Sequence, residues 1–198
     1  MRLGVFGGTF SPPHNGHVGA AMRFVVDFKL DKLLIIPTYI PPHKLLSGDA
    51  SPEQRYEMCK IAFSDIPNAE VSDIEIRRKG LSYTSDTLSE LKNNENEIFL
   101  LVGTDMFLTL DSWHEPNKIF ALSNIIYIRR ENDKTMAERI EEKRIQYIRQ
   151  FNARIFSLDT SILEISSSEV REQIRYSHES SFLPDKVMNY INERGLYR

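Results

Sequence analysis

Residues 3–19 read LGVFGGTFSPPHNGHVG, and this stretch decides the fold. Its first four residues are an apolar run bounded by glycines, as expected of a buried strand that opens a βα unit. Gly7 and Gly8 predict a sharp turn, because residues without a Cβ atom tolerate positive φ angles and let a ligand approach the backbone. The stretch therefore predicts a strand followed by a turn that suits a phosphate.

A helix is predicted next, over residues 16–28, where apolar residues recur at helical spacing. Asn15 or Ser11 is available to cap its start. His14 and His17 then lie on one side of the first turn, where free backbone N–H groups and the helix dipole favour an anion. Each histidine alone is also typical of an ordinary surface loop, but the ordered string favours a phosphate-binding function.

Segments along nearly the whole chain resemble one protein family. Gly-Gly-Thr-Phe followed by His-Asn-Gly-His is similar to the signature of the nucleotidyltransferase superfamily that carries an H-x-G-H motif. Other segments resemble bacterial nicotinate-nucleotide adenylyltransferase: PTYIPPHK at 37–44, SYTSDT at 82–87, ISSSEVR at 165–171, LPDKV at 183–187 and YINERGLY at 190–197. The resemblance implies adenylyl transfer from ATP to nicotinate mononucleotide in NAD biosynthesis, giving deamido-NAD and pyrophosphate.

Two residues depart from that family pattern. Ser11 stands where the family typically carries an aspartate, and Ser168 stands where it usually carries a threonine. Ser168 keeps the hydroxyl, and a serine at position 11 can replace a local capping contact of the carboxylate. The departures leave the core motif intact.

Composition limits the protein class. The 198 residues suffice for one sizeable core, and we expect a single domain over 1–198 in which residues 160–198 form a C-terminal helical portion that completes the ATP site. A net charge of −3 argues against nucleic-acid binding. No apolar run is long enough to cross a membrane. The single Cys59 and the absence of a signal peptide predict the cytoplasm. The sequence is compatible with a homo-oligomer and does not decide the oligomeric state.

Alternating elements predict the fold class. Apolar strand-like runs alternate with helical patterns, which predicts a Rossmann-like, doubly wound α/β fold with a mostly parallel sheet and helices on both faces. Residues 69–76 alternate more strictly and predict an edge strand. Ser51 and Gln54 predict a capping box at the start of a helix over 52–64. The remaining predicted elements are strands at 33–36, 98–102, 125–128 and 155–158, and helices at 85–93 and 134–151.

The chemistry implied by the resemblance needs no general base. The attacking phosphate of the mononucleotide is already anionic, so catalysis depends on alignment and on stabilisation of charge on the phosphate oxygens. His14, His17 and Arg171 are the catalytic candidates, with His17 the stronger transition-state donor. Residues carried over to the ATP site are Gly7, Gly8, Thr9, Phe10, His14, His17, Gly103, Asp105, Ser166, Ser167, Ser168 and Arg171.

Several of these assignments have simpler alternatives. Ser166, Ser167 and Ser168 alone are more typical of a helix cap without ligand contact, and their pairing with the histidine motif favours the phosphate-binding role. The glycine turn, Pro37 and residues 103–105 each follow a strand, so one cleft can hold all three. Whether Asp105 meets ribose, metal-bound water or the pyridine nucleotide is left open by its spacing. Magnesium is expected with ATP, held mainly by phosphates and water, and no permanent metal is predicted.

The resemblance assigns Lys44, Tyr83, Thr84 and Trp113 to the mononucleotide site. An indole stacks on a pyridine ring and a lysine attracts a phosphate or carboxylate. Trp113 as a half-buried loop anchor and Lys44 as an exposed lysine are the simpler readings. Rival functions are transfer to nicotinamide mononucleotide or to phosphopantetheine, and a nucleotide-binding module without turnover.

Overall fold

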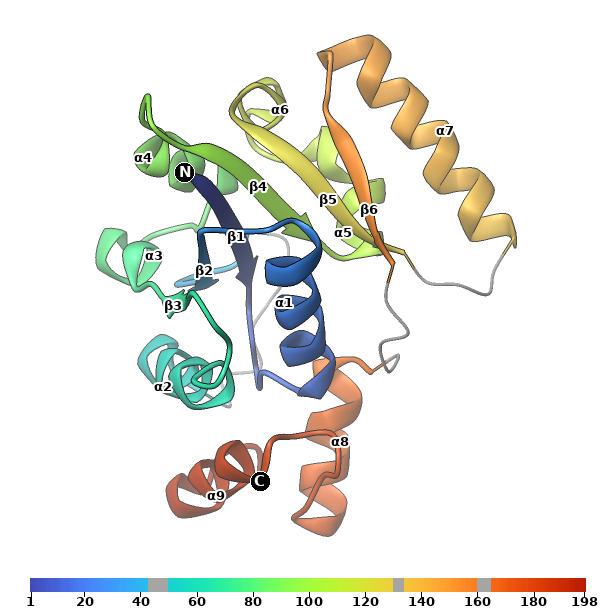
Figure 1. The fold of residues 1–198 in the computed structure, drawn as a ribbon. Coiled ribbons are helices and arrows are strands. Elements are labelled where there is room, and N and C mark those ends of the chain that lie inside the picture. Colours follow the sequence, from blue (N-terminus) through green and yellow to red (C-terminus); the bar gives the residue numbers. More distant parts are fainter. Residues whose placement is uncertain (43–49, 130–133, 160–164) are drawn as a thin grey trace.

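The computed structural model describes residues 1–42, 50–129, 134–159 and 165–198. Its described strands form one parallel sheet with helices around it (Figure 1). The strands are β1 (Arg2–Gly8), β2 (Lys32–Pro37), β3 (Ala69–Val71), β4 (Glu97–Val102), β5 (Ser123–Arg129) and β6 (Ile155–Asp159). The helices are α1 (Asn15–Asp27), α2 (Pro52–Ala62), α3 (Ile74–Arg78), α4 (Thr84–Leu91), α5 (Thr104–Leu108), α6 (Pro116–Leu122), α7 (Lys134–Phe151), α8 (Ser167–Ser177) and α9 (Asp185–Arg194), with a short 3-10 turn at Leu110–Ser112.

The strand order among these residues is β3-β2-β1-β4-β5-β6. The chain builds outward from β1 through β2 to β3, then returns to the other side of β1 with β4. The order therefore reverses between β1 and β4, and open parallel sheets bind ligands at the carboxyl ends of the strands beside such a reversal. This arrangement confirms the Rossmann-like fold class, with a sheet that is parallel throughout its described strands.

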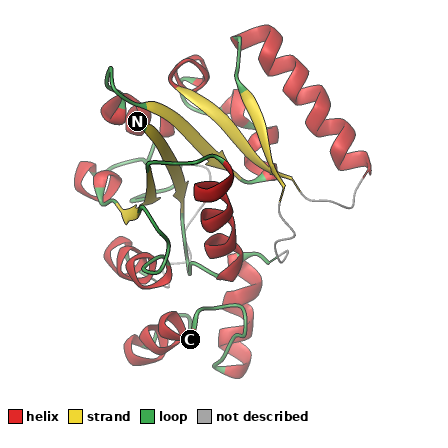
Figure 2. Cartoon of the chain, in the orientation of Figure 1, coloured by secondary structure: helices red, strands yellow, loops and turns green. Residues whose placement is uncertain are grey.

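Helices cover both faces of the sheet, as Figure 2 shows. Leu33 and Ile35 of β2 share a core with residues of α1, α2, α8 and α9. The alternate residues Leu34 and Ile36 belong to a second core with residues of α3, α4, α5, α6 and α7. Successive strand side chains point to opposite faces, so β2 contributes to both cores and is apolar along most of its length.

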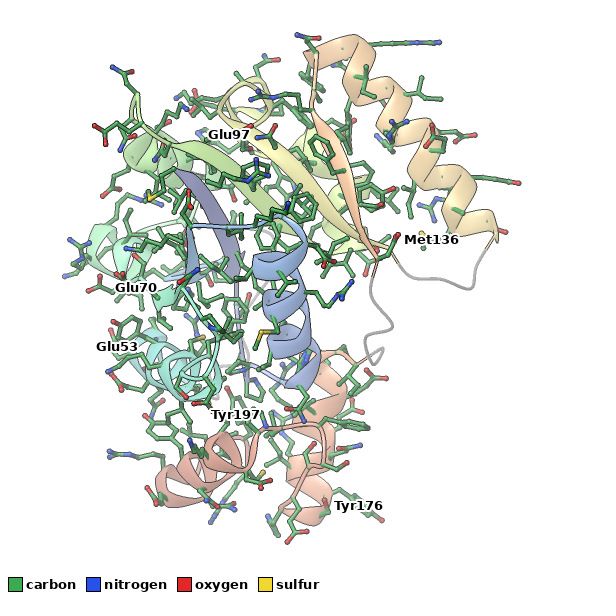
Figure 3. All side chains as sticks on the ribbon, in the orientation of Figure 1. Glu53, Glu70, Glu97, Met136, Tyr176 and Tyr197 are labelled. Carbon is green, nitrogen blue, oxygen red and sulfur yellow. The ribbon has the colours of Figure 1, made fainter. Side chains whose placement is uncertain are left out.

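The C-terminal helices pack onto the first of these cores. Val170 and Ile174 of α8 and Val187 and Ile191 of α9 are buried in it, together with Tyr197. Figure 3 labels Tyr197 between α2 and α9, two helices that contact each other. This portion of the chain shares its apolar core with the N-terminal half.

The turn after β1 differs from the sequence prediction. Gly7 and Gly8 are the last residues of β1, and neither adopts a positive φ angle; the left-handed residue is Phe10, with φ 48°. Gly8 matters for packing instead, because a Cβ atom there would lie 3.0 Å from the Phe10 ring, a tight contact that the ring would have to relieve by a small shift. The predicted caps Ser11 and Asn15 are also wrong, since His14 is the N-cap of α1.

The predicted edge strand over 69–76 is wrong beyond Val71. The chain leaves the sheet at Ser72, whose N–H donates to a carbonyl of β2, and α3 begins at Ile74. Asp73 stabilises this helix, because its carbonyl accepts the Arg77 N–H and its carboxylate pairs with the Arg77 side chain at 2.8 Å. The alternating residues 69–76 therefore span two elements, the short strand β3 and the start of α3, which are joined by a turn at residues 72–73.

Other predicted elements are confirmed. Ser51 and Gln54 form the expected capping box of α2: the Ser51 N–H donates to Gln54 Oε1 at 2.8 Å, and Ser51 Oγ accepts the Gln54 N–H. The helix at 134–151 has the predicted bounds. No helix in the described ranges is long and apolar enough to cross a membrane.

Candidate active site

A cavity of about 720 Å³ opens at the carboxyl ends of β1 and β4, where the strand order reverses. The predicted common cleft is confirmed, because segments after β1, β2 and β4 all reach its wall. The predicted site residues that line it are Gly7, Gly8, Thr9, Phe10, His14, His17, Tyr83, Thr84, Gly103, Trp113, Ser166 and Ser167. Residues from both ends of the chain thus meet in one site.

The two histidines form a stacked pair at the N-terminus of α1. Their ring centroids are 3.6 Å apart and the rings are 28° from parallel. The His14 backbone N–H donates to Nδ1 of His17 at 3.1 Å, so that nitrogen carries no proton. In a neutral imidazole the proton is then on Nε2. His17 is therefore held in the tautomer that leaves Nε2–H available as a donor.

Burial keeps both imidazoles neutral near pH 7. Desolvation lowers the pKa of His14 to about 4, although the nearby Glu169 carboxylate opposes the shift. Desolvation also lowers the pKa of His17 well below its usual value, and the charge of His14 adds to the effect. A polyanion placed against these rings would favour their charged forms and raise both pKa values.

The start of α8 lines the cavity beside the loop that carries the histidines. Ser166 Oγ accepts the Glu169 N–H, and Glu169 Oε2 accepts the N–H and the hydroxyl of Ser166. The Ser167 hydroxyl donates to the Pro12 carbonyl at 3.1 Å. Ser166 therefore caps the helix, as the simpler reading holds, and it also faces the cavity. Free N–H groups of a helix N-terminus suit an anion at this wall.

Aromatic rings bound the other end of the cavity. Tyr83 stacks on His114 with ring centroids 4.1 Å apart, and the half-buried Trp113 lies on the same wall. Thr84 begins α4 beside them. Lining residues that were not predicted include His114, Ser82 and Thr87; the last two belong to the SYTSDT segment, and His114 follows Trp113 directly, so adjacency was the available signal.

Comparison with known proteins decides the family. The Cytidylyltransferase-like family matches residues 5–173. A Desulfitobacterium hafniense protein named "Probable nicotinate-nucleotide adenylyltransferase" is 39% identical over 100% of this chain and 96% of its own length. A Geotalea daltonii protein of the same name is 37% identical over 100% and 98%. The chain belongs to the nicotinate-nucleotide adenylyltransferase family.

Solved structures agree on the fold of this adenylyltransferase. Plasmodium falciparum nicotinic acid mononucleotide adenylyltransferase complexed with NaAD gives a TM-score of 0.77 at 17% identity, covering 99% of this chain and 97% of that one. A Vibrio parahaemolyticus structure described as a putative nicotinate-nucleotide adenylyltransferase gives 0.66 at 15%, covering 96% and 99%. The Rossmann-like architecture is therefore common to proteins of widely different sequence.

Ser11 joins the loop after β1 to the C-terminal part of the chain. Ser11 is buried, and its Oγ lies 3.1 Å from the hydroxyl of Tyr197 near the C-terminus. The Ser11 carbonyl accepts from Arg171 Nη1 at 2.8 Å. Ser11 therefore ties the loop between β1 and α1 (residues 9–14, hereafter the phosphate loop) to α8 and to the C-terminal Tyr197, and it does not cap α1.

Three predicted site residues that the structure describes do not line the cavity. Asp105 is exposed on α5. Ser168 and Arg171 lie behind the wall, where Arg171 Nη2 donates to Ser168 Oγ at 3.0 Å. Lys44 lies outside the described residues. Arg171 thus hydrogen-bonds both the Ser11 carbonyl in the phosphate loop and the Ser168 hydroxyl in the first turn of α8, next to Ser167.

One side-chain group among the described residues has metal-ligating spacing. Asp86, His114 and Glu115 offer ligand atoms that all lie within 4.8 Å of one another, at the aromatic end of the cavity that His114 lines. Glu115 already pairs with Lys118 at 2.8 Å. Nothing else about the group indicates an ion, and the absence of a permanent metal stays a prediction.

The lowered pKa of His14 predicts an acid-sensitive fold. As the pH falls below 6.5, the unfolded chain takes up a proton that the folded protein accepts only near pH 4, so the free energy of unfolding decreases. From pH 7 to pH 5 this difference amounts to about 2 kcal/mol for His14. Urea unfolding should be measured at pH 7 and pH 5 for wild type and for His14→Gln. Between these pH values the free energy of unfolding should fall by about 2 kcal/mol more in the wild type than in the variant. Parallel pH profiles would contradict the prediction.

Proposed function

We propose that the protein transfers AMP from ATP to nicotinate mononucleotide, releasing pyrophosphate and forming deamido-NAD. The observation that carries the proposal is the meeting of the His14–His17 pair and the start of α8 in a cavity whose other end is aromatic. Family membership supports the same reaction, because relatives covering the whole chain are named for it.

The two ends of the cavity suit the two substrates. The phosphate end combines Gly8, Thr9, the histidine pair and the N-terminus of α8, which suits a triphosphate. The acceptor end combines Tyr83 and Trp113, which suit a pyridine ring. Lys44, Thr84 and Gly103 complete the proposed contacts, and Asp105, Ser168 and Arg171 would act from just outside the wall.

In the proposed reaction a phosphate oxygen of the mononucleotide attacks the α-phosphorus of ATP. The bond from that phosphorus to the oxygen bridging the β-phosphorus breaks in line, and pyrophosphate carries away the electron pair. The nucleophile has no proton to lose, so the chain supplies alignment and charge stabilisation. The Nε2–H of His17 would donate to an oxygen of the reacting phosphates as negative charge accumulates there.

A substrate panel tests the assignment of the acceptor. Enzyme and ATP are mixed with nicotinate mononucleotide, nicotinamide mononucleotide or phosphopantetheine, and pyrophosphate release is measured. We expect kcat/KM to be highest with nicotinate mononucleotide. Hydrogen-bond donors oriented toward its carboxylate would be left without that partner when either rival acceptor is bound. Faster transfer to either rival acceptor would overturn the assignment. ATP binding without turnover on all three would revive the non-catalytic nucleotide-binding module.

Magnesium is proposed to enter with ATP. The phosphate end of the described cavity offers imidazoles, hydroxyls and backbone N–H groups, and the one carboxylate among the lining residues, Glu75, is buried near the acceptor end. These residues fit a Mg–ATP substrate whose ion is held by phosphates and water. Chelation with EDTA should abolish turnover and leave the melting temperature without ATP unchanged. A fall in melting temperature on chelation would instead indicate a metal resident in the protein.

The cytoplasm is the proposed location of this reaction. The single cysteine, Cys59, is buried, and its pKa is raised by burial, so it is an inert thiol that fits a reducing compartment.

A further inference from the structure

Arg55 of α2 is the most deeply buried cation among the described residues. Its side chain is fully buried in the interior, and it does not line the cavity. Nη1 donates to the Thr9 carbonyl at 2.8 Å. Nη2 donates to the carbonyls of Thr38 at 2.6 Å and Tyr39 at 3.1 Å. One guanidinium therefore holds the loop that follows β1 and the loop that follows β2.

Burial of this cation is costly without a carboxylate partner. Desolvation lowers the pKa of Arg55, and no ion pair joins it to a carboxylate among the described residues. Carbonyl acceptors compensate part of that cost. Only the planar fork of a guanidinium presents donors in several fixed directions at once, so a lysine at this position could not hold both loops in the same way.

The two loops belong to the two ends of the cavity. Thr9 lies in the phosphate loop between the glycines and the histidine pair, and it lines the cavity. Thr38 and Tyr39 open the loop toward the acceptor end, where the Tyr39 N–H donates to Ser82 Oγ at 2.8 Å. The Ser82 N–H in turn donates to the Ile40 carbonyl. Through these bonds Arg55 is connected to the segment that carries Tyr83.

We propose that Arg55 is a positioning residue that sets the distance and angle between the two bound substrates. The proposal rests on the adenylyl transfer proposed above. Each substrate finds most of its contacts within its own half of the site, so Arg55 contributes little to binding either one. The in-line attack depends on the relative placement of the halves, and a misplacement of about 1 Å can cost up to 100-fold in rate.

The test compares Arg55→Lys with a control of similar burial. Met58→Ala alters the same helix at a fully buried position and removes no hydrogen bond to either loop, so it serves as the control for a loss of stability alone. Single-turnover rates at saturating ATP and nicotinate mononucleotide are measured for wild type and both variants. Binding of each substrate, with a non-hydrolysable ATP analogue in place of ATP, is measured by calorimetry. Circular dichroism at the assay temperature establishes folding.

We expect Arg55→Lys to lower the single-turnover rate about tenfold while each dissociation constant changes less than about threefold, a split that marks loss of alignment. Met58→Ala should retain the wild-type rate. A rate for folded Arg55→Lys equal to that of wild type would overturn the proposal, and so would an equal loss in Met58→Ala. If Arg55→Lys does not fold, Arg55→Gln is measured, and failure of both to fold would leave Arg55 with a purely structural role. Inactivity of the wild type on these substrates would contradict the proposed function instead.

Discussion

His17→Ala should lower kcat by about 100- to 1,000-fold, the cost of removing one preorganised donor from a charged transition state. The physical reason is the tautomer. Because Nδ1 of His17 accepts the His14 N–H, the proton of the neutral ring is on Nε2. In the proposed reaction Nε2–H would donate to a phosphate oxygen from a half-buried, desolvated position, where such a hydrogen bond is strong. The KM for ATP should change much less than kcat, since the contact strengthens as charge develops.

Steady-state kinetics with pyrophosphate detection measure this effect. His178→Asn is the matched control, because His178 ends α8 in the left-handed conformation, which asparagine also tolerates, and it lies away from the cavity. The control should keep kcat within about twofold of wild type, as surface changes generally do. A folded His17→Ala with kcat near that of wild type would show that the histidine pair is not part of the reaction.

Trp113→Ala should lower kcat/KM for nicotinate mononucleotide by about 10- to 100-fold, through loss of an aromatic stacking partner worth about 1–3 kcal/mol. The half-buried indole lies on the acceptor wall with the stacked Tyr83 and His114. Since the phosphate end is untouched, the KM for ATP should stay within about twofold, as for a change outside its contacts.

Trp113→Phe separates stacking from loop anchoring in this prediction. Phenylalanine keeps an aromatic face and should recover part of the lost kcat/KM. If Trp113 were only an anchor of its loop, alanine would lower thermal stability and affect both substrates alike. Equal increases in the KM values for ATP and for the mononucleotide would therefore argue for that simpler role.

Local signals made the core of the fold predictable. The apolar runs that became β1, β2, β4 and β5 are buried on both sides, and such strands read as continuous hydrophobic segments. The capping box at Ser51 and Gln54 fixed the start of α2. The edge at 69–76 was mistaken because a short strand and a short helix are separated by one turn, and each is too brief to show its own periodicity. The same shortness hid α5 and α6.

The predicted site was more complete near the motifs than away from them. His14, His17, Ser166 and Ser167 meet as expected, although some 150 residues of sequence separate the two pairs. The turn was placed on the glycines because they are the residues most tolerant of positive φ, yet the left-handed residue is Phe10, which its packing against Gly8 accommodates.

Contacts that depend on tertiary structure left no trace in the sequence pattern. Ser11 meets Tyr197 across almost the entire chain. Arg55 lies within an ordinary helical pattern, where an arginine is usually taken as solvent-exposed. Its burial follows from the way α2 packs over the two loops, and no spacing rule reports that.

The central claim is that AMP passes intact from ATP to the mononucleotide, and the fate of the α-phosphorus tests it most directly. Enzyme is incubated with nicotinate mononucleotide and ATP labelled at the α-phosphorus, and the products are separated by chromatography. We predict that the label appears in deamido-NAD and that pyrophosphate forms in equal amount without label. Label found in free AMP, or left in ATP while the mononucleotide is unchanged, would contradict the account.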